Sequence, residues 1–267
     1  MYNATVLNTT FVTPLIMILQ VRLDKNNFDF IPGQYTVLGL KWSEPRVSEA
    51  DPEEVPAEKQ HALIRRAYSI TSSSRSKEYL EFYISMITSG ELTPRLFHLK
   101  PGDRLYVGDG SKGMFTLKDV PPDRNILLVG TGTGLAPYIS MVRSLALEVR
   151  TPAVSMTVMH GATYSWDLGY RAELESLTRR CPKFHYFPIV ACPTIDKNWH
   201  GPSGRLQQWL TRPDIDALCG LPIDPERTHI FLCGNPVMVE SVSQLLSSKG
   251  YTHGTRHQPG TLHLEKF

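Results

Sequence analysis

The sequence contains no motif that would bind an iron–sulfur cluster or a zinc ion. Its four cysteines, Cys181, Cys192, Cys219 and Cys233, lie in the second half of the chain, and none forms the CxxC or CxxxxCxxC spacing of such ligands. Cysteines scattered in this way are typical of reduced thiols in a cytosolic protein. We therefore expect no metal site and a cytoplasmic location.

A long hydrophobic run and a strong charge of one sign are also missing. The first residues carry no basic stretch ahead of an apolar one, and Leu15–Leu19 is far shorter than the roughly 20 residues that span a bilayer. The net charge of +2 is too small to indicate nucleic acid or an anionic membrane as a partner. We expect a monomer that has no export signal and binds neither nucleic acid nor a membrane.

The length suits two domains, since 267 residues are many for one compact domain. Residues 1–122 predict an antiparallel β-barrel or sandwich, because short β-segments alternate with turn residues at regular spacing. These segments read TTFVTPLIMILQVRL, FIPGQYTVLGL, RRAYSIT, LEFYISMIT and DRLYVGDG. One helix is expected from Thr93-Pro94 to Lys100, since proline is tolerated in a first turn.

One stretch of this first half has almost no apolar periodicity. Residues 44–60 contain six acidic residues and three prolines. This composition predicts a solvated loop inserted between two strands. The alternative is a loop that docks a partner.

Residues 123–267 alternate between strands and helices, which predicts a doubly wound α/β domain with a parallel sheet. The expected strands read NILLVG, VSMTVMHGA, KFHYFPIVA and HIFLCG. The expected helices read LAPYISMVRSLALEV, DLGYRAELESLTRR, GRLQQWL and VMVESVSQLLSSKG. The domain boundary is expected near Asp119–Asn125.

The strongest local signal is NILLVGTGTGLAPYISMV, in which a buried strand runs through Gly130, Gly132 and Gly134 into a helix. Glycines let a pyrophosphate approach the backbone, and a helix N-terminus favours its charge. A tight βα turn without a ligand is the alternative, because the spacing is not GxGxxG. At the end of the next strand, His160 to Thr163 offer neither an acid for a ribose 2′-hydroxyl nor an arginine for a 2′-phosphate.

Two further segments carry side chains that could bind a cofactor. Arg66 and Tyr68 end a strand with a cation suited to a diphosphate and a ring suited to an aromatic cofactor. A plain edge strand with a solvated arginine and a core tyrosine is the alternative. Cys233 ends a later strand, at the edge where open α/β sheets bind ligands. The alternative there is a buried structural thiol.

Taken in order, RxYS, GTGTGxAP and CGNPxxM resemble the motifs of the ferredoxin/flavodoxin–NADP reductase family, bacterial type. The resemblance includes LEFYISMITSGELTPRLFHLKPGD and the terminal LEKF and covers nearly the whole chain. It implies an FAD-binding antiparallel β-barrel over residues 1–122. It further implies a doubly wound NADP-binding α/β domain over residues 123–267, whose C-terminal tail returns to the flavin.

The resemblance also implies the activity. Members of this family exchange electrons between NADP(H) and ferredoxin or flavodoxin, by hydride transfer at flavin N5 and by single-electron steps. By this resemblance Ser69 hydrogen-bonds near N5, Cys233 positions the nicotinamide, and Glu265 acts at the ring edge. Phe267 would cover the flavin face.

The other residues that the resemblance assigns to cofactors fall into two groups. FAD would contact Arg66, Ala67, Tyr68, Tyr83, Ile84, Ser85, Gly90, Glu91, Leu92 and Thr93. The nicotinamide nucleotide would contact Thr131, Gly132, Thr133, Gly134, Pro137, His160, Gly161, Thr163, Arg205, Gly234, Asn235 and Met238.

Two departures from the family bear on the nucleotide. NADP-using members commonly carry arginines where this chain has Thr163 and Cys192, whereas Arg205 matches a phosphate-facing position and Arg171 lies on the following helix. We favour NADP, with NAD as the alternative. An NADH-dependent reductase of an oxygenase or of free flavin is the rival function. A non-catalytic flavin- or nucleotide-binding regulator is disfavoured by the retained Ser69, Cys233 and Glu265.

Overall fold

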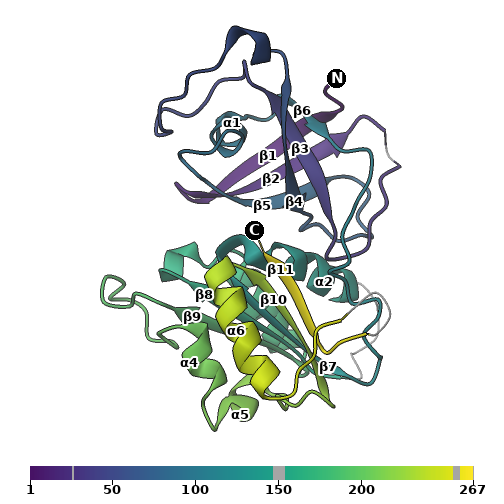
Figure 1. The fold of residues 1–267 in the computed structure, drawn as a ribbon, viewed down its shortest axis with the longest axis vertical. Helices are drawn as coiled ribbons and strands as arrows, with labels where there is room; N and C mark the ends of the chain where they lie inside the picture. Colours follow the sequence, from purple (N-terminus) through teal and green to yellow (C-terminus); the bar gives the residue numbers. More distant parts are fainter. Residues whose placement is uncertain (26, 147–153, 255–258, 267) are drawn as a thin grey trace. The chain divides into compact units, whose positions relative to one another are not determined.

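The computed structural model describes residues 1–25, 27–146, 154–254 and 259–266 (Figure 1). These residues form two compact units. The first comprises Met1–Thr116 together with helix α2 (Ala136–Ala146), and the second comprises the other described residues from Leu117 onward.

The first unit is a closed antiparallel barrel. Its strands are β1 (Ala4–Thr13), β2 (Ile16–Leu23), β3 (Tyr35–Lys41), β4 (Leu63–Ser69), β5 (Leu80–Ser85) and β6 (Arg104–Val107), in the spatial order β4-β3-β6-β1-β2-β5. An antiparallel bridge between Ile70 and Phe82 joins the two ends of this order. The expected barrel is therefore confirmed.

Alternation of side chains along these strands fills the barrel. Leu19, Leu38, Phe82, Ile84 and Leu105 are all buried in one apolar cluster, as expected for strands with one face toward a core. The segment TTFVTPLIMILQVRL is a hairpin rather than one strand. Its tight turn follows from the pairing of residue 13 with residue 16.

Two helices belong to the first unit. Helix α1 (Thr93–His98) confirms the helix expected at Thr93-Pro94, and it ends once Leu99 adopts an extended backbone. Helix α2 joins the barrel through polar contacts. Ser140 donates a 2.8 Å hydrogen bond to the Ser72 carbonyl, and Arg143 Nη1 lies 2.6 Å from the buried Glu81 carboxylate.

The stretch between β3 and β4, residues 42–62, is here named the insert. It is a loop between two strands, as expected, with one short 3₁₀ helix, η1 (Ala57–Lys59). It is not wholly solvated, because the Glu53 side chain is only 14% exposed and pairs with Arg46 and Arg95.

The second unit contains a five-stranded parallel sheet in the order β11-β10-β7-β8-β9. The strands are β7 (Asn125–Thr131), β8 (Met156–Ala162), β9 (Phe184–Val190), β10 (Thr228–Gly234) and β11 (Leu262–Lys266). The helices are α3 (Arg171–Arg180), α4 (Leu206–Leu210), α5 (Ile215–Cys219) and α6 (Pro236–Ser248), with 3₁₀ turns η2 (Gly132–Leu135) and η3 (Ser165–Asp167). Figure 1 shows α6 lying along the sheet.

This sheet confirms the α/β domain expected from the alternating pattern. Its central strands β7, β8 and β10 are almost wholly buried, as is usual in parallel sheets. Leu127, Ile230 and Leu232 pack with Leu206 of α4 and Val242 of α6 in one cluster. Among the described residues, no helix is both long enough and apolar enough to cross a membrane.

Candidate functional site

Strand β4 presents the residues Arg66 to Ser69 along its pairing with β3, with Tyr68 opposite Thr36 and Ser69 opposite Tyr35. Arg66 and Ala67 are exposed, whereas Tyr68 and Ser69 are half-buried. Burial raises the pKa of Tyr68 above its ordinary value, although the charge of Arg66 opposes this. Tyr68 therefore stays a neutral ring packed at the edge of the barrel core.

The guanidinium of Arg66 contacts an anion from another part of the barrel unit. Its Nη1 donates to the Arg65 carbonyl at 2.8 Å, and its Nη2 forms an ion pair with the Glu91 carboxylate. More than half of the Arg66 side chain remains exposed, at 56%. The position thus combines a fixed cation with open access.

Glu91 sits in a tight turn that precedes α1. Thr93 Oγ1 accepts a hydrogen bond from the Ile87 amide and donates one to the Ile87 carbonyl, both at 3.1 Å. A Cβ on Gly90 would lie 3.0 Å from the Ile87 carbonyl oxygen, closer than ordinary contacts. A side chain at Gly90 would therefore press on the turn, and Leu92 and Thr93 behind it are buried.

Strand β5 holds Tyr83, Ile84 and Ser85 in alternating directions. Ile84 belongs to the barrel core, while Tyr83 is also buried, at 4% exposure, and Ser85 is half-buried. The role of this segment in FAD binding stays a prediction.

In the second unit, the glycine-rich loop after β7 is interlocked with the end of β10. A Cβ on Gly134 would lie 2.4 Å from the Cys233 carbonyl oxygen, and one on Gly234 would lie 2.5 Å from Thr131 Oγ1. Gly132 and Gly234 also have positive φ angles of 54° and 124°. Only glycine permits this approach, so the two motifs form one corner of the sheet.

Hydrogen bonds fix the same corner. The Asn235 amide donates to Thr131 Oγ1 at 3.1 Å, which ties the start of α6 to the loop. Asn235 Oδ1 in turn accepts from the amides of Val237 and Met238 at 2.9 and 3.3 Å, as an N-cap residue does. Met238 is buried behind it.

Cys233 and Glu265 lie side by side because parallel pairing of β10 with β11 puts them in register. The Cys233 thiol is fully buried and donates to Glu265 Oε2 at 3.7 Å. Burial, followed by the neighbouring Glu265, raises the pKa of Cys233 well above its ordinary value. The thiol is therefore protonated at neutral pH and acts as a hydrogen-bond donor, not a nucleophile.

His160 lies beneath the glycine-rich loop and has no exposed surface. Its Nε2 is 3.3 Å from the Gly132 carbonyl oxygen and its Nδ1 is 3.1 Å from the Tyr186 hydroxyl. Burial lowers the pKa of His160 to about 4, so the ring is neutral. The neighbouring Gly161 leaves room for Leu206. A Cβ added to Gly161 would lie 3.0 Å from Leu206 Cδ1.

The ends of β8 and β9 form the region expected to read the ribose. The Cys192 amide donates to the Thr163 carbonyl at 3.0 Å, and both residues are exposed. Arg205 is exposed at the start of α4. Arg171, by contrast, is paired with Glu175 at 2.6 Å and lies over the Trp199 ring at 5.1 Å.

Each unit thus brings together its own part of the expected set. The first gathers Arg66 and the Gly90–Thr93 turn, and the second gathers the loop, Cys233 and Glu265. Pro137 is buried in the first turn of α2. Phe267 lies outside the described residues. Among those described, no cluster of three or more metal-ligating side chains occurs.

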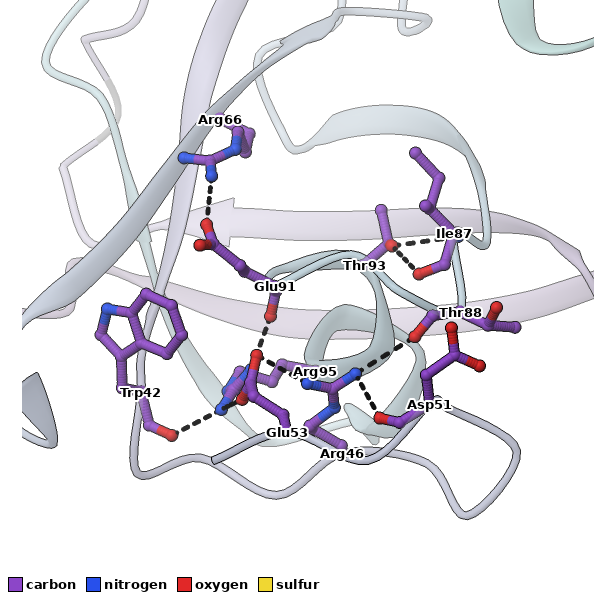
Figure 2. A network of polar contacts seen from close by, with 10 residues as sticks. All are labelled: Trp42, Arg46, Asp51, Glu53, Arg66, Ile87, Thr88, Glu91, Thr93 and Arg95. Carbon is purple, nitrogen blue, oxygen red and sulfur yellow. Dashed lines mark hydrogen bonds and ion pairs between the residues drawn. The ribbon is translucent and has the colours of Figure 1, made fainter. Parts of the chain in front are cut away.

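Two groups of residues at the site were missed by sequence reasoning. Tyr186 contacts His160 across β8 and β9, and the parallel alignment of these strands was the only signal for it. Glu53, Arg46 and Arg95 form a cluster behind the Glu91 turn (Figure 2). An arginine amid the apolar residues of a short helix was a signal for this cluster.

Comparison with known proteins decides the family. Residues 54–117 match the oxidoreductase FAD-binding domain, and residues 128–244 match the oxidoreductase NAD-binding domain. A flavodoxin/ferredoxin–NADP reductase of Buchnera aphidicola subsp. Baizongia pistaciae is 30% identical over 240 residues, which cover 89% of this chain and 88% of that protein. The chain belongs to the ferredoxin/flavodoxin–NADP reductase family.

Two further relatives extend this finding. The toluate 1,2-dioxygenase electron transfer component of Pseudomonas putida is 29% identical, and the match spans 100% of this chain and 67% of that protein. A ferredoxin NADP+ reductase from Neisseria gonorrhoeae, crystallised with FAD and NADP, has the same fold, with a TM-score of 0.82 at 22% identity and coverage of 99% and 97%. The reductase is thus a flavoprotein oxidoreductase with FAD-binding and nicotinamide-nucleotide-binding domains.

Proposed function

We propose that this reductase exchanges electrons between NADP(H) and ferredoxin or flavodoxin. The observation that carries the proposal is the 3.7 Å contact between the Cys233 thiol and the Glu265 carboxylate. It lies at the carboxyl edge of the parallel sheet, beside the glycine-rich loop, where α/β domains of this type bind nucleotides. Bound FAD supplies the exchange between hydride and single electrons.

The barrel has residues that fit FAD. Arg66 already binds one anionic group, the Glu91 carboxylate, and keeps an exposed face. A diphosphate is a suitable ligand for such a guanidinium. We assign Tyr68 to stacking on the flavin ring and Ser69 to a hydrogen bond near its reactive nitrogen.

The glycine-rich loop fits the pyrophosphate of the nucleotide. Its glycines are pressed against β10, since a Cβ on Gly134 would lie only 2.4 Å from the Cys233 carbonyl oxygen. Thr131 to Thr133 keep part of their surface exposed. We assign Cys233 to holding the nicotinamide ring in place through a neutral thiol. We assign Glu265 to the edge of the flavin ring, where its carboxylate would accept or return a proton.

We propose NADP as the preferred nucleotide, held by Arg205. An arginine can bind a phosphate through two parallel hydrogen bonds, and Arg205 is exposed at the start of α4. Arg171 is less suited, because it is engaged with Glu175 and Trp199. The uncharged Thr163 and Cys192 are the observation that favours NAD as the alternative, since they offer a 2′-phosphate no charge.

Anaerobic titration of the purified yellow protein with NADPH and NADH tests the proposal. NADPH is expected to bleach the flavin, and in steady-state turnover with an electron acceptor it is expected to give a higher kcat/KM than NADH. Arg205→Ala is expected to lower kcat/KM for NADPH by about tenfold, the effect of one lost charge-assisted contact, while sparing NADH. A preference of the unchanged enzyme for NADH would overturn the nucleotide assignment but not the enzyme class.

The electron acceptor needs a separate experiment. The similarity to the toluate dioxygenase component favours service to an oxygenase as the second candidate function. Cytochrome c reduction is expected to rise strongly when ferredoxin or flavodoxin is added. Equal rates with and without a carrier would favour direct reduction of another acceptor, and failure to bleach the flavin would favour a regulator.

We propose a monomeric protein of the cytoplasm. Four free thiols in the described structure suit a reducing compartment. Size-exclusion chromatography with light scattering tests the monomer, and fractionation of the source cells tests the compartment.

A further inference from the structure

A largely shielded cluster of charges holds the insert against helix α1. The Glu53 carboxylate forms two ion pairs. Arg95 Nη2 lies 2.5 Å from one of its oxygens, and Arg46 Nη1 lies 2.6 Å from the other. The three side chains are only 14%, 2% and 15% exposed, respectively. Ion pairs in such surroundings are screened far less than surface pairs.

Hydrogen bonds to backbone carbonyls also hold the insert against the segment that contains the Glu91 turn. Arg46 Nη2 donates to the carbonyls of Asp51 and Thr88 at 3.0 and 3.1 Å, and the Asp51 amide donates to Thr88. The Val47 amide donates to the Pro94 carbonyl at 3.2 Å. The insert therefore follows the segment that leads into α1.

A chain of contacts continues from this cluster to Arg66 (Figure 2). Arg95 Nη1 donates to the Glu91 carbonyl at 2.6 Å, and its Nη2 also donates to the Trp42 carbonyl at 2.7 Å. The Glu91 carboxylate then pairs with Arg66. The backbone position of Glu91 thus depends on where Glu53 holds Arg95.

The charge balance of the cluster makes Glu53 its central member. Two guanidinium groups share one carboxylate, and the Nε atoms of Arg46 and Arg95 are buried without a hydrogen-bond acceptor in the described structure. Burial alone would raise the pKa of Glu53, but hydrogen bonds from Arg95 and Arg46 hold it below its ordinary value. Without that charge, the buried cation of Arg95 would face the half-buried cation of Arg46.

We propose that Glu53 is a positioning residue for the FAD diphosphate, acting from the insert through Arg95 on the Glu91 turn. The inference rests on the proposed function, because it requires Arg66 and the Glu91 turn to bind the diphosphate of FAD. It gives the acidic insert a definite role in the selection of FAD over flavins that lack the diphosphate.

Binding of FAD and of riboflavin to the flavin-stripped full chain tests this inference. Riboflavin carries the same ring but neither the diphosphate nor the adenosine, so the ratio of the two dissociation constants reports the contribution of the ADP part of FAD. Glu53→Gln is expected to weaken FAD binding about tenfold, the usual cost of a lost charge-assisted contact, and to leave riboflavin binding within about twofold. Glu54→Gln is the matched control, because its side chain lies exposed in the same insert.

Glu53→Asp retains the charge and is expected to give an intermediate ratio, which keeps the test decisive if Glu53→Gln does not fold. An unchanged FAD constant in both variants, or an equal loss of FAD and riboflavin binding, would overturn the positioning role and leave the proposed function intact. An unsubstituted chain that binds no flavin would overturn both.

Discussion

His160 is a neutral imidazole fixed in one tautomer by its neighbours. Because the Gly132 carbonyl can only accept, Nε2 carries the proton, and Nδ1 accepts from the Tyr186 hydroxyl. The ring thereby holds the residue at which the glycine-rich loop turns with a positive φ of 54°. Since His160 has no exposed surface of its own, we expect it to act on a bound nucleotide through the loop.

Replacement of His160 is expected to weaken nucleotide binding selectively. His160→Leu removes the hydrogen-bond donor to the half-buried Gly132 carbonyl, so the dissociation constant for NADP+ should rise by about tenfold. His160→Gln restores a donor and should recover part of the affinity. Difference spectroscopy measures NADP+ binding, and FAD affinity serves as the control. Equal affinities in all three proteins would contradict this role for the imidazole.

The four cysteines are expected to differ widely in reactivity. Cys192 is exposed, whereas Cys219 and Cys233 are buried. Burial raises the pKa of Cys219 to about 12, and the pKa of Cys233 is raised as well. Iodoacetamide should therefore label Cys192 first, as read by peptide mass spectrometry, and Cys192→Ser should remove the fast phase. Labelling of Cys233 at the rate of Cys192 would contradict the buried thiol.

At the scale of elements, the corner between the glycine-rich loop and β10 tolerates no side chain at Gly134. Gly134→Ala places a methyl group 2.4 Å from the Cys233 carbonyl oxygen, so the backbone must shift. We expect a loss of about 1–3 kcal/mol in the free energy of unfolding, together with weaker NADP+ binding. Urea denaturation measures the first and spectroscopic titration the second.

Gly110→Ala is the matched control for that substitution. No atom lies within 4 Å of a Cβ at Gly110, and the residue is exposed. Its stability and NADP+ binding should match those of the unchanged protein. Similar losses in both variants would show that the corner is not especially tight.

The sequence predicted most elements because their signals are local. Alternating apolar residues identified the barrel strands, and runs such as NILLVG identified the buried strands of the sheet. Strand β11 was missed because LHLEK mixes polar and apolar residues and forms only by pairing with β10, some thirty residues earlier in the chain. Helix α5 was missed because five residues carry too little periodicity.

The candidate site was predictable in its parts but not in its contacts. The motifs around Arg66, Gly134 and Cys233 could be recognised by type and order. The pairing of Cys233 with Glu265 depends on strand register, which no spacing in the sequence fixes. The Glu53 cluster joins residues 42 positions apart. No local pattern indicates such a contact, so the sequence predicted a solvated loop for the insert.

At the scale of the whole molecule, stability is expected to fall under mild acid because of histidines in the second unit. Burial lowers the pKa of His160 to about 4, and burial together with His229 does the same for His263. The pKa of His229 is also lowered, by burial and by Arg124. In the unfolded chain these groups titrate near their ordinary value of about 6.5.

Between these values the unfolded chain binds more protons than the folded one, so lowering the pH favours unfolding. The melting temperature should therefore decline as the pH falls from about 6.5 toward about 4. The variants His160→Gln and His263→Gln should each reduce this dependence. Thermal melts followed by circular dichroism across this pH range provide the measurement. A melting temperature that does not change with pH would contradict the prediction.

Strand β11 couples the stability of the sheet edge to the position of the Glu265 carboxylate. Its five residues form an edge of the parallel sheet, and one of them, Glu265, sits beside the Cys233 thiol. Edge elements detach more readily than central strands when a protein opens locally. Fraying of this edge would remove the carboxylate while the remaining sheet stays folded. With the role proposed for Glu265, activity should therefore decay at temperatures where most of the secondary structure still survives.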